Sequence, residues 1–130
     1  MIQKRQSPIS GAGVFATQPI PADAFIVEYK GEKITAAEGR RREARYLKRG
    51  RIWVFMLDDR RARDAAYGGN VGRYVNHSCR PNCYSEIVDD QIWIRALRDI
   101  RRGEELTYDY CTDSEAGIKC LCRPGCRTTL

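Results

Sequence analysis

The sequence has very little of several features that identify common protein classes. Its 130 residues include a single histidine, His77, which a Ser-His-Asp or Cys-His hydrolase would have to use as its base. Cys79 lies close to it in the chain, but the groups of such triads usually come from distant segments, which disfavours this interpretation. The phosphate-binding pattern GxxxxGK[ST] is absent, so a P-loop protein is not supported.

Long apolar segments are also lacking. No stretch approaches the roughly 20 apolar residues that a membrane-spanning helix needs, so we expect no membrane partner. The first five residues are followed by polar residues and Pro8, which do not form the apolar core of a signal peptide. We therefore expect an intracellular protein in a reducing compartment, where thiols stay free or bind metal. The length fits one domain.

Positive charge exceeds negative charge. The chain has 23 lysines and arginines against 17 aspartates and glutamates, a formal net charge of +6. Such a surplus suits an acidic or nucleic-acid-associated partner, but a similar charge is common on soluble domains. Direct binding of nucleic acid is therefore the less favoured interpretation.

Short apolar segments bounded by turn residues predict a chain that is mostly β. Residues 11–13, Gly-Ala-Gly, are typical of a turn that leads into an apolar strand. Residues 25–29 are rich in branched and aromatic side chains, as strands are. Residues 84–88 and 91–97 predict a hairpin around Asp89-Asp90. Further strands are expected over residues 51–57 and 106–110.

One helix is predicted by its start and stop signals. Thr35 followed by Glu38 forms a capping-box pattern, so a helix should begin near Ala36 and run to about Lys48, with Gly50 as the stop. The expected apolar face is thin and consists of Ala37, Ala44, Tyr46 and Leu47. The expected solvated face carries Arg40, Arg41, Arg42 and Arg45.

The cysteines near the C-terminus are closely spaced. Cys120, Cys122 and Cys126 form the pattern C-x-C-x3-C. In a reducing compartment such a cluster more often binds metal than forms disulfides. Three thiolates leave tetrahedral zinc one ligand short. Spacing alone does not choose the fourth ligand among Cys79, Cys83 and Cys111.

Two polar motifs lie between the expected strands. Residues 76–83, NHSCRPNC, are compatible with a loop held by side-chain hydrogen bonds. Residues 104–110, EELTYDY, place Tyr108 and Tyr110 on the same face of a strand. Taken singly, the first motif is explained by a capped loop and the second by two half-buried core tyrosines.

Taken together and in this order, the motifs resemble the SET domain of protein-lysine methyltransferases. The resemblance runs from about Pro8 to Arg127 and includes Tyr29-Lys30-Gly31 besides the motifs above. NHSCRPNC and GEELTYDY look closest to the mixed-lineage-leukaemia type, whose members methylate histone H3. The resemblance implies a mostly β fold with short helices, similar to a β-clip, in which the two motifs form a pseudoknot-like crossing. It also implies a SET domain over residues 1–110 and a short post-SET zinc-binding tail over residues 111–130, as one structural unit.

The resemblance assigns roles to individual residues, with S-adenosylmethionine as methyl donor and S-adenosylhomocysteine as product. Donor binding is assigned to Ser10, Gly11, Ala12, Gly13, Trp53, Arg73, Asn76, His77, Tyr110 and Leu121. Catalysis is assigned to Tyr110 with Tyr108 and Tyr29, and the lysine channel to Tyr29, Phe55 and Tyr108. One structural zinc is assigned to Cys79, Cys120, Cys122 and Cys126, although the family's usual C-x-C-x4-C is one residue shorter here.

The resemblance also implies partners. The expected substrate is a lysine of a histone or of a histone-like nucleoid protein, with mono- or dimethylation favoured by Tyr108. The chain reads as a minimal, free-standing SET protein, located in cytoplasm or nucleoid if bacterial and in the host nucleus if viral or an effector. Such a domain is compatible with a homodimer that completes the substrate groove. The alternatives are a catalytically inactive SET module that binds a peptide or partner, and a zinc module that binds nucleic acid.

Overall fold

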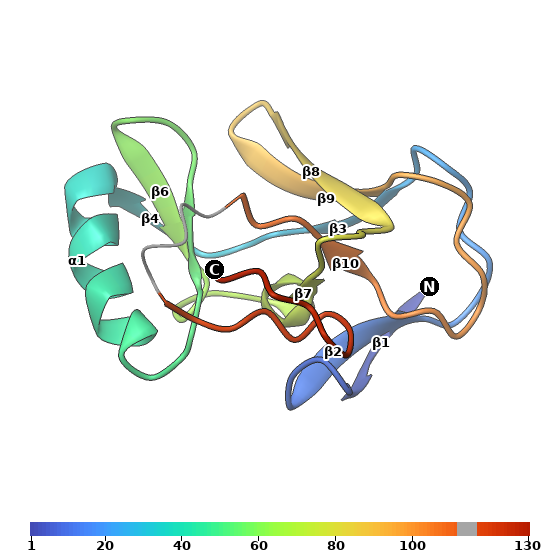
Figure 1. The fold of residues 1–130 in the computed structure, drawn as a ribbon. Helices are drawn as coiled ribbons and strands as arrows, with labels where there is room; N and C mark the ends of the chain where they lie inside the picture. Colours follow the sequence, from blue (N-terminus) through green and yellow to red (C-terminus); the bar gives the residue numbers. More distant parts are fainter. Residues whose placement is uncertain (112–116) are drawn as a thin grey trace.

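Strands dominate the computed structural model, which describes residues 1–111 and 117–130 (Figure 1). Within these residues they form two two-stranded and two three-stranded sheets, accompanied by one α-helix and one short 3-10 helix. The mostly β fold class with short helices is confirmed. The elements are β1 (Ile2–Gln6), β2 (Ala12–Ala16), β3 (Phe25–Glu28), β4 (Glu32–Thr35), α1 (Ala36–Leu47), β5 (Val54–Met56), β6 (Arg61–Asp64), η1 (Val71–Tyr74), β7 (Asn76–His77), β8 (Cys83–Val88), β9 (Gln91–Ala96) and β10 (Thr107–Tyr108).

The predicted helix is present with the predicted start. The side chain of Thr35 accepts a hydrogen bond of 3.1 Å from the backbone N–H of Glu38, so one of the unpaired donors of the first turn is satisfied. The predicted apolar face is wrong in part, because Ala37 and Ala44 are exposed. The buried residues of α1 are instead Ala36 and Gly39.

Gly39 explains how α1 lies so close to its sheet. A side chain there would come within 3.0 Å of Cβ of Ala62 on β6 and 3.2 Å of Cγ1 of Val54 on β5. The helix therefore approaches the sheet β4-β6-β5 through its smallest residue, which lies against β6 and β5. Glycine carries no apolar side chain, so the apolar pattern of the sequence does not reveal this face of the helix.

Arg42 is not the solvated residue that the sequence predicted. Its side chain is 18% exposed and pairs with the fully buried carboxylate of Asp64 on β6 at 3.0 Å. It also pairs with Glu32 and Glu38 at 3.2 Å each. The hydroxyl of Tyr46 donates to the same Asp64 carboxylate at 2.6 Å. These bonds satisfy a buried anion, which would otherwise be strongly unfavourable.

Replacing Asp64 by asparagine should therefore lower the free energy of unfolding by about 2 kcal/mol, the value of hydrogen bonds to a charged group. The measurement is urea unfolding followed by tryptophan fluorescence. Asp59→Asn, at an exposed position, serves as the matched control and should leave the midpoint unchanged. Equal midpoints for Asp64→Asn and the wild type would contradict the prediction.

The predicted hairpin is confirmed as β8 and β9. Asp89 and Asp90 both adopt the left-handed region, with φ of 49° and 65°, which aspartate tolerates better than most residues. Strand β9 also pairs with β3, so the sheet order is β3-β9-β8. One face of this sheet contributes to the main core, whose buried members include Val14, Ile20, Val27, Val75, Ile94, Ala96, Ile100, Leu106 and Tyr108.

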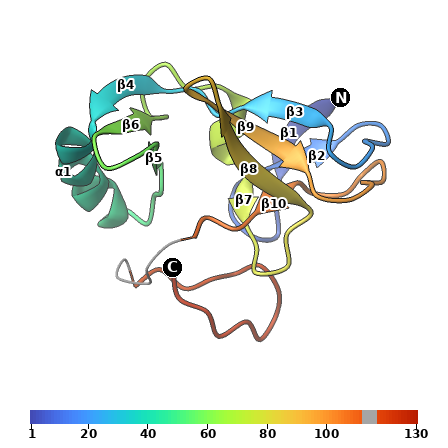
Figure 2. The ribbon, with the colours of Figure 1, turned by 90° about the horizontal axis from the view of Figure 1, so that it is seen from above.

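Strands β7 and β10 join two distant segments in a short parallel pair (Figure 2). Asn76 is the register partner of Thr107, and His77 that of Tyr108. The side chain of Asn82 fixes the pair, because its amide donates to the carbonyl of Glu105 at 2.8 Å and its oxygen accepts from the N–H of Thr107 at 2.9 Å. The NHSC and ELTYDY motifs therefore lie side by side.

The C-terminal segment returns to the edge of the domain. Ile118 and Leu130 exchange backbone hydrogen bonds of 3.3 and 2.7 Å, which close residues 118–130 into a loop. This loop packs against Ile52 and Cys79. Residues 112–116 of the predicted tail lie outside the described residues. Neither helix of the described chain is long and apolar enough to cross a membrane.

Candidate functional site

A cavity of about 240 Å³ lies where several distant segments meet. Its walls come from the loop before β2, the segment before β5, the η1–β7 region, Tyr110 and the C-terminal loop. Most of the residues predicted to bind a methyl donor line it: Ser10, Ala12, Arg73, Asn76, His77, Tyr110 and Leu121. Leu121 is 54% exposed, so an apolar surface at the rim is open to a ligand.

Gly11, Gly13 and Trp53 lie outside this lining. A side chain at Gly13 would overlap with the carboxylate of Glu105, so this glycine is required by a contact inside the protein. Trp53 packs edge-on against Tyr46 at 5.4 Å between ring centroids, and its carbonyl accepts a hydrogen bond from Tyr29. Their predicted donor contacts stay predictions.

Several lining residues were not predicted from the sequence. They are Ile9, Gly50, Arg51, Ile52, Tyr74, Ile118, Lys119 and Leu130, whereas Cys120, which also lines the cavity, was predicted as a zinc ligand. Ile9, Ile52, Tyr74 and Lys119 directly adjoin predicted site residues, and that proximity was the only available signal for them. Leu130, the last residue, carried no signal, because only the closed C-terminal loop brings it to the cavity.

His77 links the cavity to the cysteines. Its Nδ1 accepts a hydrogen bond of 3.1 Å from the backbone N–H of Tyr110. Burial lowers the pKa of His77, although Asp109 at 3.7 Å opposes this, so the ring is neutral near pH 7. A neutral ring whose Nδ1 accepts must carry its proton on Nε2, which lies 3.5 Å from the sulfur of Cys79.

Three tyrosines converge beside the cavity. The Tyr110 hydroxyl donates to the Val75 carbonyl at 2.5 Å, and its ring centroid lies 4.8 Å from that of Tyr108. The Tyr29 hydroxyl donates to the Trp53 carbonyl at 2.7 Å, and its ring lies 5.4 Å from that of Phe55. The predicted catalytic and channel residues thus form two aromatic pairs, Tyr108 with Tyr110 and Tyr29 with Phe55, and the two rings of each pair are in contact.

Burial is the main cause that raises the pKa of Tyr29, Tyr108 and Tyr110. All three hydroxyls therefore stay protonated at neutral pH. They can orient a ligand by hydrogen bonds, but a phenol this hard to deprotonate does not act as a general base.

Four cysteine sulfurs, those of Cys79, Cys120, Cys122 and Cys126, lie within 4.8 Å of one another. The sulfur of Cys79 is 3.8 Å from that of Cys120 and 3.9 Å from that of Cys126. Two thiolates that bind one tetrahedral zinc at ~2.3 Å are about 3.8 Å apart. The cluster therefore has the size of a zinc site.

Of the three candidates for a fourth sulfur, Cys79 is the one that lies in the cluster. Cys83 is buried outside the cluster, where burial raises its pKa to about 12, and Cys111 is exposed. In the cluster, hydrogen bonds from Thr128 are the main cause that lowers the pKa of Cys126 to about 6. The thiol of Cys126 therefore ionises easily, which favours metal binding, whereas burial raises the pKa of Cys120 to about 12.

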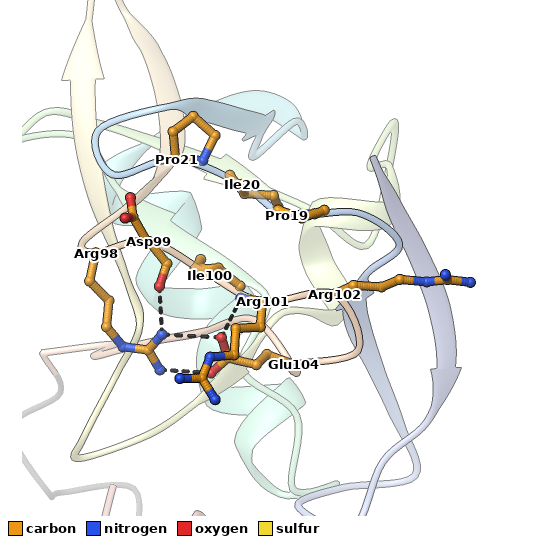
Figure 3. Close-up of a pocket in the computed structure, with 9 residues that line it drawn as sticks. All are labelled: Pro19, Ile20, Pro21, Arg98, Asp99, Ile100, Arg101, Arg102 and Glu104. Carbon is orange, nitrogen blue, oxygen red and sulfur yellow. Dashed lines mark hydrogen bonds and ion pairs between the residues drawn. The ribbon is translucent and has the colours of Figure 1, made fainter.

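A second, larger hollow of about 1020 Å³ lies on another part of the surface (Figure 3). Its lining consists of Pro19, Ile20, Pro21, Arg98, Asp99, Ile100, Arg101, Arg102 and Glu104. Its polar groups are largely paired with each other, since Glu104 accepts from Arg98 at 2.8 Å and from the N–H of Arg101 at 2.6 Å. None of the predicted site residues is among them, so the smaller cavity at Tyr110 is the candidate site.

Comparison with known proteins identifies the family of this chain. The sequence profile of the SET domain matches residues 11–111. The chain belongs to the SET domain family. The predicted family is confirmed, and with it the SET-type fold, in which the NHSC and ELTYDY segments pair as β7 and β10.

Curated relatives of this chain are named as histone-lysine methyltransferases. The chain is 41% identical over 93% of its length to a Chaetomium globosum protein named "Histone-lysine N-methyltransferase, H3 lysine-4 specific". It is 44% identical over 94% of its length to the Drosophila melanogaster "Histone-lysine N-methyltransferase trr". It spans only 13% and 5% of these two proteins.

A solved structure shares the fold. It is a humanized mutant of the Chaetomium thermophilum Polycomb Repressive Complex 2 bound to an inhibitor. The TM-score is 0.73 at 36% identity, over 85% of this chain and 15% of that one. The fold of the SET domain therefore extends to this chain.

Proposed function

We propose that this protein transfers a methyl group from S-adenosylmethionine to a lysine side chain of a histone or histone-like chromosomal protein. The observation that carries the proposal is the convergence of Tyr110, Asn76 and His77 at one cavity, with the buried Tyr108 ring packed against that of Tyr110. The curated relatives, named as histone-lysine methyltransferases, support the same activity and substrate class.

The cavity suits the donor in its chemistry. It combines apolar lining from Ile9, Ile52 and Leu121 with cationic side chains from Arg51, Arg73 and Lys119. Such a mixture fits a molecule with an aromatic base at one end and an amino-acid carboxylate at the other. We assign donor binding to the lining residues predicted from the sequence, with Leu121 covering the base. When bound, the donor supplies an electrophilic methyl group on a positively charged sulfur.

The aromatic channel prepares the lysine. A free lysine has a pKa of about 10.4, so only about one in 2,500 is neutral at pH 7. Tyr29, Phe55 and Tyr108 form a largely buried, apolar wall that disfavours the charged amine. The neutral nitrogen then bonds to the methyl carbon while the carbon–sulfur bond breaks with its electrons going to sulfur. The methylated ammonium afterwards releases a proton to water.

The Tyr110 hydroxyl is assigned the orienting role at the methyl group. It is fixed by its bond to the Val75 carbonyl, and its backbone is fixed by His77. Holding the reacting atoms in line lowers the activation barrier by up to ~7–11 kcal/mol in well-oriented systems. No base is required within this site at the transfer step, which agrees with a chain that has a single histidine.

Tyr108 is proposed to limit the product to the mono- or dimethylated state. It is 4% exposed and stacks against Tyr110, so its hydroxyl takes up room beside the amine. Tyr108→Phe should therefore shift the product distribution towards trimethyllysine by about tenfold, the effect of roughly 1.4 kcal/mol on competing steps.

Mass spectrometry of the modified substrate peptide measures this distribution directly. Tyr84→Phe, whose hydroxyl contacts Asp23 on a distant surface, is the control and should leave the products unchanged. The same product pattern for Tyr108→Phe and the wild type would contradict the assignment.

The zinc proposal rests on the four sulfurs. Zinc held by Cys79, Cys120, Cys122 and Cys126 would attach the C-terminal loop to the NHSC segment and so complete one wall of the cavity. Its role there is structural, because four protein ligands leave no open position for catalysis.

The proposal is tested by mixing the protein with labelled S-adenosylmethionine and two substrates, core histones and bacterial nucleoid proteins. Label on a lysine would identify the activity and the substrate class. Donor binding without transfer to any substrate would favour the alternative of an inactive module that binds a peptide. Absence of donor binding in calorimetry would overturn the proposal.

A further inference from the structure

Glu105 is a charged residue in an unusual setting beside the cavity. It follows Glu104 immediately, yet the two carboxylates lie in different environments. Glu104 pairs with Arg98 on the surface, at the larger hollow (Figure 3). Glu105 is partly buried and, among the described residues, forms no ion pair with an arginine, lysine or histidine.

The contacts of the Glu105 carboxylate are all neutral. The hydroxyl of Ser7 lies 2.8 Å from both of its oxygens, and the amide of Asn76 donates to it at 2.8 Å. Gly13 leaves the space that the carboxylate occupies, since a side chain there would overlap with it. The protein thus builds a specific place for an anion without supplying a cation for it.

This anion lies directly behind the wall of the cavity. The Asn76 amide that binds it also donates to the Ala12 carbonyl at 2.8 Å, and both residues line the cavity. The lining includes arginines and a lysine, but no aspartate or glutamate is among these described lining residues. Asp109 lies 3.7 Å from His77, but its side chain is 55% exposed and its charge is screened by water.

The charge of Glu105 also acts on Tyr110, the residue that we assign to the methyl group. After burial, the charge of Glu105 is the other cause that raises the pKa of Tyr110. The hydroxyl of Tyr110 and the carboxylate of Glu105 are therefore close enough to interact. In a partly buried setting, the interaction energy of two charges is several times larger than at the same distance in water.

We propose that Glu105 supplies the counter-charge for the sulfonium of the methyl donor and so makes the site prefer the donor over its product. The inference rests on the proposed function. The donor carries a positive sulfur, whereas S-adenosylhomocysteine carries a neutral one. A fixed anion near Tyr110 therefore favours binding of the donor over binding of S-adenosylhomocysteine. The product dissociates more readily because its sulfur no longer carries a charge. Glu105 acts through the field and through Asn76, so it is a positioning residue.

Isothermal titration calorimetry of the intact protein with S-adenosylmethionine and with S-adenosylhomocysteine tests this, without any methyl transfer. Glu105→Gln keeps the size of the side chain and one acceptor oxygen for the Asn76 amide, and it removes the charge. We expect the ratio of the two affinities to fall by about tenfold or more, since a unit charge contributes about 1.4 kcal/mol at an effective dielectric near 20 even from about 12 Å away.

Two further variants separate charge from structure. Glu104→Gln changes the net charge of the chain equally, at the other hollow, and should leave the ratio unchanged. Glu105→Asp keeps the charge on a shorter side chain and should preserve the ratio even where both affinities fall. Equal weakening of both ligands in Glu105→Gln would overturn the inference and leave the proposed function intact. Failure of the wild type to bind either ligand would overturn both.

Discussion

Tyr110→Phe is expected to reduce methyl transfer by roughly 100- to 1000-fold, the usual effect of removing one hydroxyl or amide that acts on the reacting atoms. The hydroxyl of Tyr110 is held in place by the Val75 carbonyl at 2.5 Å, and its backbone N–H is held by His77. Phenylalanine keeps the ring and its packing against Tyr108, so only the orienting group is lost. The measurement is the initial rate of label transfer at saturating donor.

Donor affinity distinguishes a catalytic role from a structural one. Tyr110→Phe should bind the donor within about fivefold of the wild type, since one neutral hydrogen bond has a net value of about 1 kcal/mol. Tyr84→Phe is the matched control, because it removes a phenolic hydroxyl from an exposed contact with Asp23. Wild-type transfer rates in Tyr110→Phe would remove Tyr110 from the mechanism.

Cys126→Ser is expected to abolish zinc binding and, with it, donor binding. The remaining sulfurs of the cluster, those of Cys79, Cys120 and Cys122, cannot complete a tetrahedron. Structural zinc contributes on the order of 10 kcal/mol in small zinc modules, far more than the few apolar contacts of the C-terminal loop. Cys120 and Leu121 line the cavity, so a loop that detaches removes part of its wall.

Zinc content is measured by atomic emission on the purified protein, and donor affinity by calorimetry. The expected values are one zinc per chain for the wild type and about a tenth or less for Cys126→Ser, given the loss of affinity. Cys111→Ser is the control, because Cys111 is exposed and lies outside the cluster. Full zinc content in Cys126→Ser would contradict the four-cysteine assignment.

Local signals predicted the elements that local chemistry determines. The Thr35 cap gave the start of α1, and the paired aspartates Asp89 and Asp90 gave the hairpin β8–β9. Each of these features depends on residues a few positions apart. The family motifs named most of the cavity lining for a different reason, because they carry information about contacts that no local pattern contains.

Other strands were missed because their sequences are polar. Strand β1, Ile2–Gln6, lies at the edge of a two-stranded sheet and is mostly exposed, so it has no apolar alternation. Strand β6, Arg61–Asp64, has charged residues inside the protein, where Arg63 donates to the Asp90 carbonyl and Asp64 binds Arg42. Buried charges that are satisfied by partners cannot be distinguished from surface charges in a sequence.

The cavity itself could not be predicted without the resemblance. Cys79 became the fourth member of the cysteine cluster only because the C-terminal loop returns to the NHSC segment. Glu105 is a still clearer case, since two adjacent glutamates have the same chemistry in sequence but different partners in the fold, Arg98 for Glu104 and Ser7 with Asn76 for Glu105. Only the position of Gly13 and Asn76 around one of them shows which is placed at the site.

The parallel pairing of β7 with β10 also has a consequence for the order of folding. The β8–β9 hairpin lies between these strands in sequence and forms from neighbouring residues, whereas β7 and β10 must close a long loop before they gain any contact. Asn76 and His77 form β7, and Tyr110 lies two residues after the end of β10. During refolding, hairpin signals should therefore appear first, and methyl-donor binding should appear only in the slowest phase.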